Sequence, residues 1–244
     1  MRRILILSTV FALFALPASA QTVDEILARY VKSLGGMEKI QAVQTLRRTG
    51  KYIGGGGFEA LMMQENKRRS FIRGEFTLQG MTAISAYDGK TGWKIEPWNG
   101  KKDPEALGEE EMKGILDDAD FDGPLINYKE KGYKVEFIGK DTFEGTETFK
   151  LKATKPNGDV YIYYLDTDYY VPIKIDTKRI VRGAEREYET ALADYKEVAG
   201  WYLPHSIESN VKGSQNKSQV VYEKIEANVP LDDSRFHMPV AKQP

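Results

Sequence analysis

Apolar and polar residues alternate with a period of two along most of the chain, which is the pattern of β-strands with one buried face. About eleven such stretches follow one another at intervals of roughly 8 to 12 residues, and most are separated by turns that contain Gly. They cover residues 57–66, 69–78, 81–87, 92–98, 133–140, 146–154, 159–165, 171–178, 185–195, 201–209 and 219–227. The pattern predicts one domain, over residues 21–244, built on a single antiparallel sheet or barrel.

Two segments near the start of the chain follow the helical period of 3.6 residues instead. Residues 23–34 come directly after Thr22, and Thr22 and Glu25 have the spacing of a capping box. A second, shorter helix is expected over residues 37–43. Each helix has one apolar face, so each is expected to pack against the sheet.

A third helical segment interrupts the series of strands. It is expected to begin at Asp103-Pro104, because Pro is favoured in the first turn of a helix. Gly108 and Gly114 weaken this helix by about 1 kcal/mol each relative to Ala, so it is either a movable lid or an ordinary connection. Its apolar side is formed by Met112, Ile115 and Leu116.

The apolar phase of the strands predicts which side chains face the interior. Phe71 and Phe76 differ in parity, so a bulge near Gly74 is needed for both to point inward. Three short helices can hardly cover so large a sheet, so the interior is either an apolar cavity or a fully packed core. The predicted inward set is Phe58, Met62, Phe71, Phe76, Leu78, Trp93, Ile95, Phe137, Phe149, Leu151, Ile162, Tyr164, Ile173 and Ile175.

The first twenty residues have the features of a cleaved signal peptide. Arg2 and Arg3 precede an apolar run over residues 4–17, and Ala18-Ser19-Ala20 is a typical cleavage site. The run is too short to span a bilayer of about 30 Å. Cleavage before Gln21 would leave no Cys for lipid attachment, so we expect an exported, soluble, unlipidated monomer.

Composition and charge exclude several classes of function. A formal net charge of −1 offers no basic surface for nucleic acids, and the absence of Cys excludes thiol catalysis and Cys-based metal sites. The only histidines, His205 and His237, have no partner spacing for a metal, so no cofactor is expected. Asp118 to Gly123 match half of an EF-hand loop, but the Glu required at position 12 is replaced by Lys129, which favours an acidic turn.

Several stretches of the chain are similar to stretches of a known family and occur in the same order. Together they extend over almost the whole chain after residue 20. The chain resembles the periplasmic proteins that sort outer-membrane lipoproteins, the LolA/LolB-like superfamily. The resemblance rests on residues 23–46, on Tyr87-Asp88-Gly89-Lys90-Thr91-Gly92-Trp93 with Pro97-Trp98, on residues 120–125 and 132–135, on residues 200–205 and on Phe236-His237-Met238-Pro239.

The resemblance implies an α+β fold in which a strongly curved antiparallel half-barrel has helices over its concave face. It also implies a non-enzymatic periplasmic protein that binds lipids or the acyl chains of lipoproteins, in exchange with a membrane-bound donor or acceptor. In the family, an arginine inside the barrel holds the lid closed; the candidates here are Arg47, Arg48, Arg69 and Arg73. Two alternatives remain open, namely a protein-interaction or sensor module on the same fold and a hydrolase that uses paired carboxylates.

Overall fold

The computed structural model describes residues 21–68, 70–100 and 102–240, so the predicted signal peptide at residues 1–20 lies outside the described residues. The helices are α1 (Val23–Ser33), α2 (Met37–Ala42) and α3 (Glu109–Ala119), with 3-10 turns η1 (Pro97–Asn99) and η2 (Asp233–Arg235). The strands are β1 (Thr45–Ile53), β2 (Glu59–Lys67), β3 (Phe71–Leu78), β4 (Met81–Asp88), β5 (Gly92–Ile95), β6 (Glu105–Ala106), β7 (Lys134–Phe143), β8 (Thr146–Thr154), β9 (Val160–Asp166), β10 (Pro172–Val181), β11 (Ala184–Val198), β12 (Trp201–Val211) and β13 (Ser218–Ala227).

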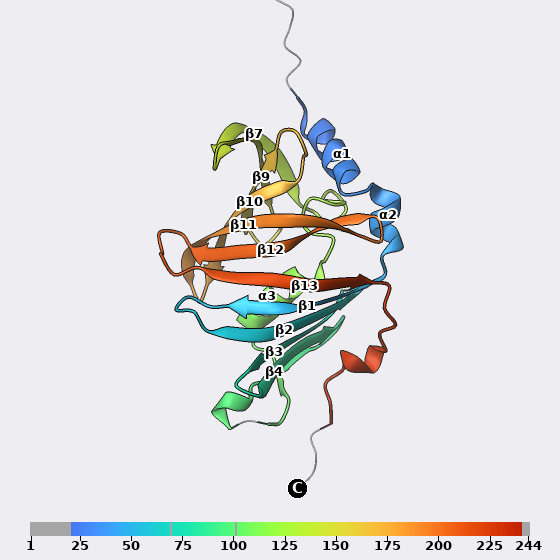
Figure 1. Ribbon diagram of the computed structural model, residues 1–244, viewed down its shortest axis with the longest axis vertical. Coiled ribbons are helices and arrows are strands. Elements are labelled where there is room, and N and C mark those ends of the chain that lie inside the picture. The colour runs from blue at the N-terminus through green and yellow to red at the C-terminus, as the bar shows by residue number, and fades with distance from the viewer. Residues whose placement is uncertain (1–20, 69, 101, 241–244) are drawn as a thin grey trace, which may run out of the picture.

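Within these residues the strands form one open, curved antiparallel sheet, shown in Figure 1. The strand order is β6-β5-β4-β3-β2-β1-β13-β12-β11-β10-β9-β8-β7, so the last strand returns to pair with the first. The predicted sheet is therefore confirmed, with thirteen strands in place of about eleven.

The two additional strands, β1 and β6, differ from the pattern used to find the others. The inward side of β1 carries Arg48 and Gly50 between Leu46 and Tyr52, so its apolar alternation is interrupted. Strand β6 has only two residues, which pair with β5. Because residues 105–106 are extended, α3 begins at Glu109 rather than at Asp103-Pro104, which corrects the predicted start.

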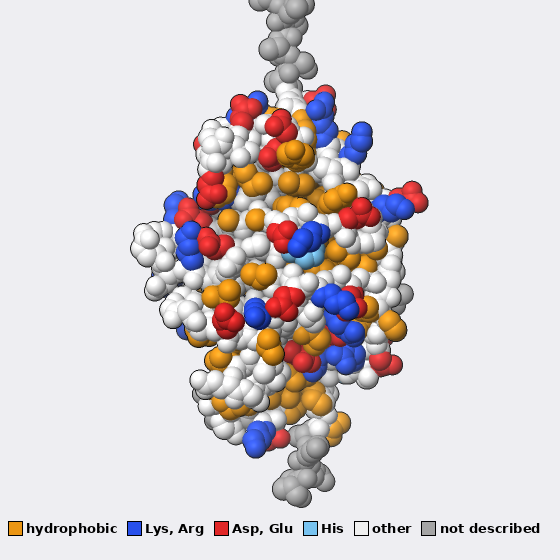
Figure 2. Space-filling model, viewed as in Figure 1, with side chains coloured by type: hydrophobic (Ala, Val, Ile, Leu, Met, Phe, Trp, Pro, Cys, Tyr) orange, Lys and Arg blue, Asp and Glu red, His pale blue; other side chains and the backbone are white. Residues whose placement is uncertain are grey.

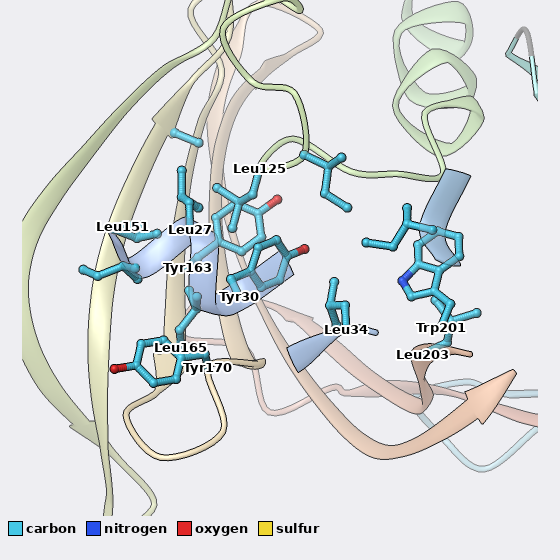
Figure 3. Close-up of a cluster of buried hydrophobic side chains, with 14 of the residues drawn as sticks. Leu27, Tyr30, Leu34, Leu125, Leu151, Tyr163, Leu165, Tyr170, Trp201 and Leu203 are labelled. Atoms are coloured by element: carbon cyan, nitrogen blue, oxygen red, sulfur yellow. The ribbon is translucent and has the colours of Figure 1, made fainter. Parts of the chain in front are cut away.

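Helix α1 covers one end of the concave face. Its capping box is present, since the Thr22 hydroxyl accepts from the Glu25 amide at 3.2 Å and the Glu25 carboxylate accepts from the Thr22 amide at 2.9 Å. Ile26, Leu27 and Tyr30 are buried along one side of the helix. They pack with side chains from α2, β1, β8, β9 and β12, and this is the main core, part of which is drawn in Figure 3.

The chain after β13 covers the opposite, convex face of the first strands. Phe236 is fully buried there, with its ring 5.4 Å from that of Phe71, and its carbonyl accepts a 2.7 Å hydrogen bond from the Trp93 indole. The buried carboxylate of Glu65 binds Arg47 and Arg235, each at 2.8 Å. This half of the sheet therefore has a packed layer on each side.

The face seen in Figure 2 carries charged side chains of both signs with apolar side chains between them. Such a mixture does not create the basic field that nucleic-acid binding requires. In the part of the chain that the structure describes, every helix is too short or too polar to cross a bilayer.

Candidate functional site

Two pockets lie in the trough formed by the concave face, each with a volume of about 380 Å³. The first, here called the lid pocket, lies between α3 and strands β2 to β5, and its lining includes Met62, Ile72, Phe76, Leu107 and Ile115. The second, here called the α1 pocket, lies between α1, the loop after α3 and strands β9 to β13, and its lining includes Tyr30, Leu34, Tyr163, Ile175 and Trp201. Both volumes are within the usual range for ligand sites.

Helix α3 packs on the sheet through a small apolar cluster. Ile115 and Ala119 are buried against Ile72 of β3, and Met112 is partly buried beside them. Leu116 is 43% exposed and lies outside this cluster, which corrects its prediction as a packed lid residue. A helix that buries so few apolar side chains is held by only a modest hydrophobic contribution.

Polar contacts fix both ends of α3. Near its start, the Lys94 ammonium binds the carboxylates of Glu111 at 2.6 Å and Glu96 at 2.9 Å. Near its end, Asp117 pairs with Lys155 and accepts a 2.9 Å hydrogen bond from the Tyr161 hydroxyl. Lys94 belongs to β5 and Tyr161 to β9, so the helix is tied to both halves of the sheet, namely β1 to β6 with β13 on one side and β7 to β12 on the other.

The two pockets meet beneath the last turn of α3, where Gln64 and Asp118 line both. Asn66 is fully buried there and donates a 2.9 Å hydrogen bond to the Asp118 carbonyl. Arg48 donates to the Asn66 side chain at 2.8 Å and lies over the Tyr222 ring, 6.0 Å from its centroid. This network is a further polar connection between α3 and the sheet, at the point where the two pockets meet.

Of the four arginines considered for the lid contact, Arg48 has the position that the role requires. Arg47 and Arg73 lie on the convex face, where they bind Glu65 and Glu75 at 2.8 Å. Arg69 lies outside the described residues. Arg68, which was not considered, holds the loop after α3 by binding the Asp122 carboxylate at 2.6 and 3.0 Å.

Several of the predicted inward residues do lie on the concave side. Met62 and Phe76 line the lid pocket, and Ile175 lines the α1 pocket. Phe137, Phe149 and Leu151 are packed in or against the main core rather than lining either pocket. Leu78 shares the concave face with Phe76, because the two residues are two positions apart in β3. The ring of Phe58 packs against that of Tyr52, with 5.7 Å between the ring centroids.

Phe71, Trp93 and Ile95 lie on the convex face, contrary to the prediction. Strand β3 keeps a continuous register with β2 from Phe71 to Thr77, so the bulge expected near Gly74 is absent from β3. Phe71 and Phe76 therefore point to opposite sides. Trp93 pairs with Ala86 and contacts the chain after β13, and Ile95 shares the face of Trp93.

Ile162 and Tyr164 are also on the convex face. The Tyr164 hydroxyl donates to Asp176 at 2.8 Å, and its ring lies between the ammonium groups of Lys150 and Lys174, 5.2 and 5.0 Å from its centroid. The core contains Tyr161, Tyr163 and Leu165 from the other phase of β9. Ile173 lies at a register shift in β10 and lines a separate groove with Tyr169 and Tyr170.

The residues that the sequence analysis missed are mostly aromatic. Tyr163 and Trp201 line the α1 pocket, but residues 160–165 are apolar on both phases, so alternation alone does not choose between them. The neighbouring strand β8, which precedes β9 in the chain, shows which phase faces inward. Phe149 and Leu151 alternate cleanly with Lys150 and Lys152, and antiparallel pairing places Leu151 opposite Tyr163.

The charged groups of the trough are arranged in pairs rather than as a metal site. Among residues 21–68, 70–100 and 102–240, no three His, Asp or Glu side chains are placed to hold a metal ion. In the acidic turn after α3, Asp120 binds Lys131 at 2.6 Å and Asp122 binds Arg68. His205 is buried, with Nδ1 3.1 Å from the Leu203 carbonyl oxygen.

An open, curved antiparallel sheet with helices over an apolar concave trough defines the LolA-like fold, and the solved structures agree. The chain is similar to a LolA superfamily protein from Nitrosomonas europaea, with a TM-score of 0.59 and 14% identity over 89% of this chain and 98% of that one. A domain named for outer membrane lipoprotein sorting, from Vibrio parahaemolyticus, gives a TM-score of 0.57 and 14% identity over 87% and 94%.

A DUF1329 family protein from Desulfovibrio piger gives a TM-score of 0.60 and 12% identity over 89% of this chain and 98% of that chain. At such low identity these similarities establish the fold. At the level of sequence, no family model matches the chain, and no curated protein does.

Proposed function

We propose that this chain is a non-enzymatic binder and carrier of lipids or of the acyl chains of lipoproteins, in the periplasm after removal of residues 1–20. The observation that carries the proposal is the lid pocket, in which Met62, Ile72 and Phe76 of the sheet face Ile115 of α3 across about 380 Å³. The LolA-like fold supports it. A membrane-bound donor or acceptor would complete the exchange.

In the proposed mechanism an acyl chain enters between α3 and strands β2 to β5. Each buried methylene contributes roughly 0.8 kcal/mol, so a chain of about 12 carbons gains up to about 10 kcal/mol before the ordering of chain and lid is subtracted. Arg48 acts as the lid contact through Asn66, and its release accompanies opening. The small apolar area beneath α3 keeps the cost of opening low.

Native mass spectrometry of residues 21–244, purified from the periplasm of the expression host, tests the proposal. We expect a bound mass that extraction identifies as phospholipid or fatty acid, and uptake of a fluorescent fatty acid or lipopeptide by the emptied protein. Phe76→Asp places a charge in the lid pocket and should abolish both.

The matched control is Ile162→Asp, since Ile162 lies on the convex face opposite Lys152 and Asp176. This variant should retain uptake, and circular dichroism should show that both variants are folded. A protein that carries no lipid and takes up none would argue against the proposal and favour a protein-interaction module. Equal loss in both variants would show that the lid pocket is not the site.

A further inference from the structure

The α1 pocket contains hydrogen-bond donors that no residue in the described part of the chain accepts from. Trp201 is 2% exposed, and its indole N–H has no hydrogen-bond partner among the described residues. A buried donor without a partner costs about 1 to 3 kcal/mol and is uncommon in folded proteins. Such a group in the wall of a pocket points to an acceptor that arrives with a ligand.

Two further hydroxyl groups line the same pocket. Tyr30 of α1 and Tyr163 of β9 are 7% and 5% exposed, and within the described parts of the chain neither hydroxyl makes a hydrogen bond to another residue. Figure 3 shows these two hydroxyls and the Trp201 nitrogen directed toward the space between them. Three groups from three different elements therefore converge on one region of an otherwise apolar pocket.

The charges around this region disfavour an anion. The lining of the α1 pocket includes the carboxylates of Asp117, Asp118, Asp120 and Asp122, and the cations Lys155, Lys131 and Arg68 are already paired with Asp117, Asp120 and Asp122. The one cationic side chain in the lining, Arg48, donates to Asn66. Burial raises the pKa of Tyr30, and the charges of Asp122 and Asp120 raise it further, which shows that negative charge is unfavourable at this hydroxyl. An uncharged oxygen acceptor fits the three donors without this repulsion.

We propose that the α1 pocket binds the uncharged carbonyl of an ester or amide at the end of an acyl chain, with Trp201, Tyr30 and Tyr163 as donors. The hydrocarbon part extends past Gln64 and Asp118, which line both pockets, into the lid pocket. This inference rests on the proposed function and adds that the ligand is an acyl ester or acyl amide rather than a free fatty acid.

Access to the Trp201 N–H is coupled to the lid. The Phe121 ring lies 6.0 Å from the Trp201 ring, and Phe121 belongs to the loop that directly follows α3. Arg68 holds this loop through Asp122 and lies over the Phe121 ring, 4.9 Å from its centroid. Movement of α3 and its loop uncovers the indole, so the carbonyl reaches its donor as the acyl chain enters.

The test measures displacement of an apolar fluorescent dye from residues 21–244 by three probes: methyl laurate, laurate and 1-tetradecene. At about pH 7.5, methyl laurate should bind at least about tenfold more tightly than laurate. Each hydrogen-bond donor is removed in turn by Tyr30→Phe, Tyr163→Phe and Trp201→Phe. Each substitution should weaken the binding of methyl laurate by about 3- to 10-fold, which corresponds to the loss of one hydrogen bond, and change the affinity for 1-tetradecene by less than about twofold.

Tyr52→Phe is the matched control, because Tyr52 packs against Phe58 and Phe76 away from the α1 pocket, and it should change neither probe. Monolaurin and an N-lauroylated peptide then distinguish a glycerolipid from a lipopeptide as the source of the carbonyl. If laurate binds as tightly as its ester, or if the variants weaken ester and alkene equally, the inference is wrong while lipid binding stands. If none of the probes displaces the dye, the proposed function itself fails.

Discussion

Asp118 is the residue whose protonation we expect to affect stability within the trough. It lies in the last turn of α3, where the loss of solvation deep in the trough, and secondarily the charge of Asp117, raise its pKa to about 6. An unperturbed Asp has a pKa of about 3.9. Between about pH 4 and pH 6 the Asp118 side chain is therefore more protonated in the folded protein than in the unfolded chain, so its contribution to stability falls as the pH rises through this interval.

Asp118→Asn removes this penalty, because the Asn66 contact uses the main-chain carbonyl of residue 118 and is retained. We expect a higher melting temperature than that of the unchanged protein at about pH 7.5, and a difference that shrinks toward pH 4.5. Thermal unfolding followed by circular dichroism measures both. Glu223→Gln is the control, since the Glu223 side chain is 61% exposed. A destabilised Asp118→Asn at pH 7.5 would contradict the argument.

At the same scale, single residues show what alternation can and cannot predict. In β8 the charged Lys150 and Lys152 define the outer phase, so the inward direction of Phe149 and Leu151 followed from the sequence. In β9 both phases are apolar, because the outer face buries Tyr164 between two lysines. Phe71 was misplaced for a related reason: the chain after β13 forms a second apolar layer outside the sheet.

At the scale of elements, only one of the two glycines, Gly114, lowers the stability of α3 from within the helix. Gly108 precedes the helix as its N-cap, whereas Gly114 lies within it, and an added Cβ at Gly114 would meet no atom within 4 Å. Gly114→Ala should therefore stabilise α3 by up to about 1 kcal/mol. We expect stronger hydrogen-exchange protection of the α3 amides and slower lipid exchange.

Gly108→Ala is the matched control and should produce neither effect, because residue 108 is the N-cap of α3 and Ala is a poorer N-cap than Gly. If Gly114→Ala protects the α3 amides yet leaves lipid exchange unchanged, α3 is a fixed connection and not a lid. The sequence predicted this helix and two of the three residues of its apolar side, Met112 and Ile115. It could not predict its first residue, because the extended pairing of residues 105–106 with β5 is a tertiary contact.

At the scale of the whole molecule, the seam between the two halves of the sheet is short. Strand β12 pairs with β13 only from Ser206 to Ser209, whereas β1 pairs with β13 along most of its length. The halves are also joined by the core around α1 and by α3, whose ends bind Lys94 in one half and Tyr161 in the other. Helix α3 therefore joins strands on both sides of this short pairing.

The chain after β13 stabilises one half independently of that seam. Phe236 is fully buried between this segment and the convex face, so Phe236→Ala should lower the free energy of unfolding by about 3 to 5 kcal/mol. Urea denaturation measures the loss, and Met238→Ala is the control because Met238 is 43% exposed. Since Phe236 lies on the face opposite both pockets, the affinity for methyl laurate in the folded variant should be unchanged. An unchanged urea midpoint would show that this segment is not part of the fold's core. A weaker affinity for methyl laurate in the fully folded variant would show that packing on the convex face affects the pockets in the trough.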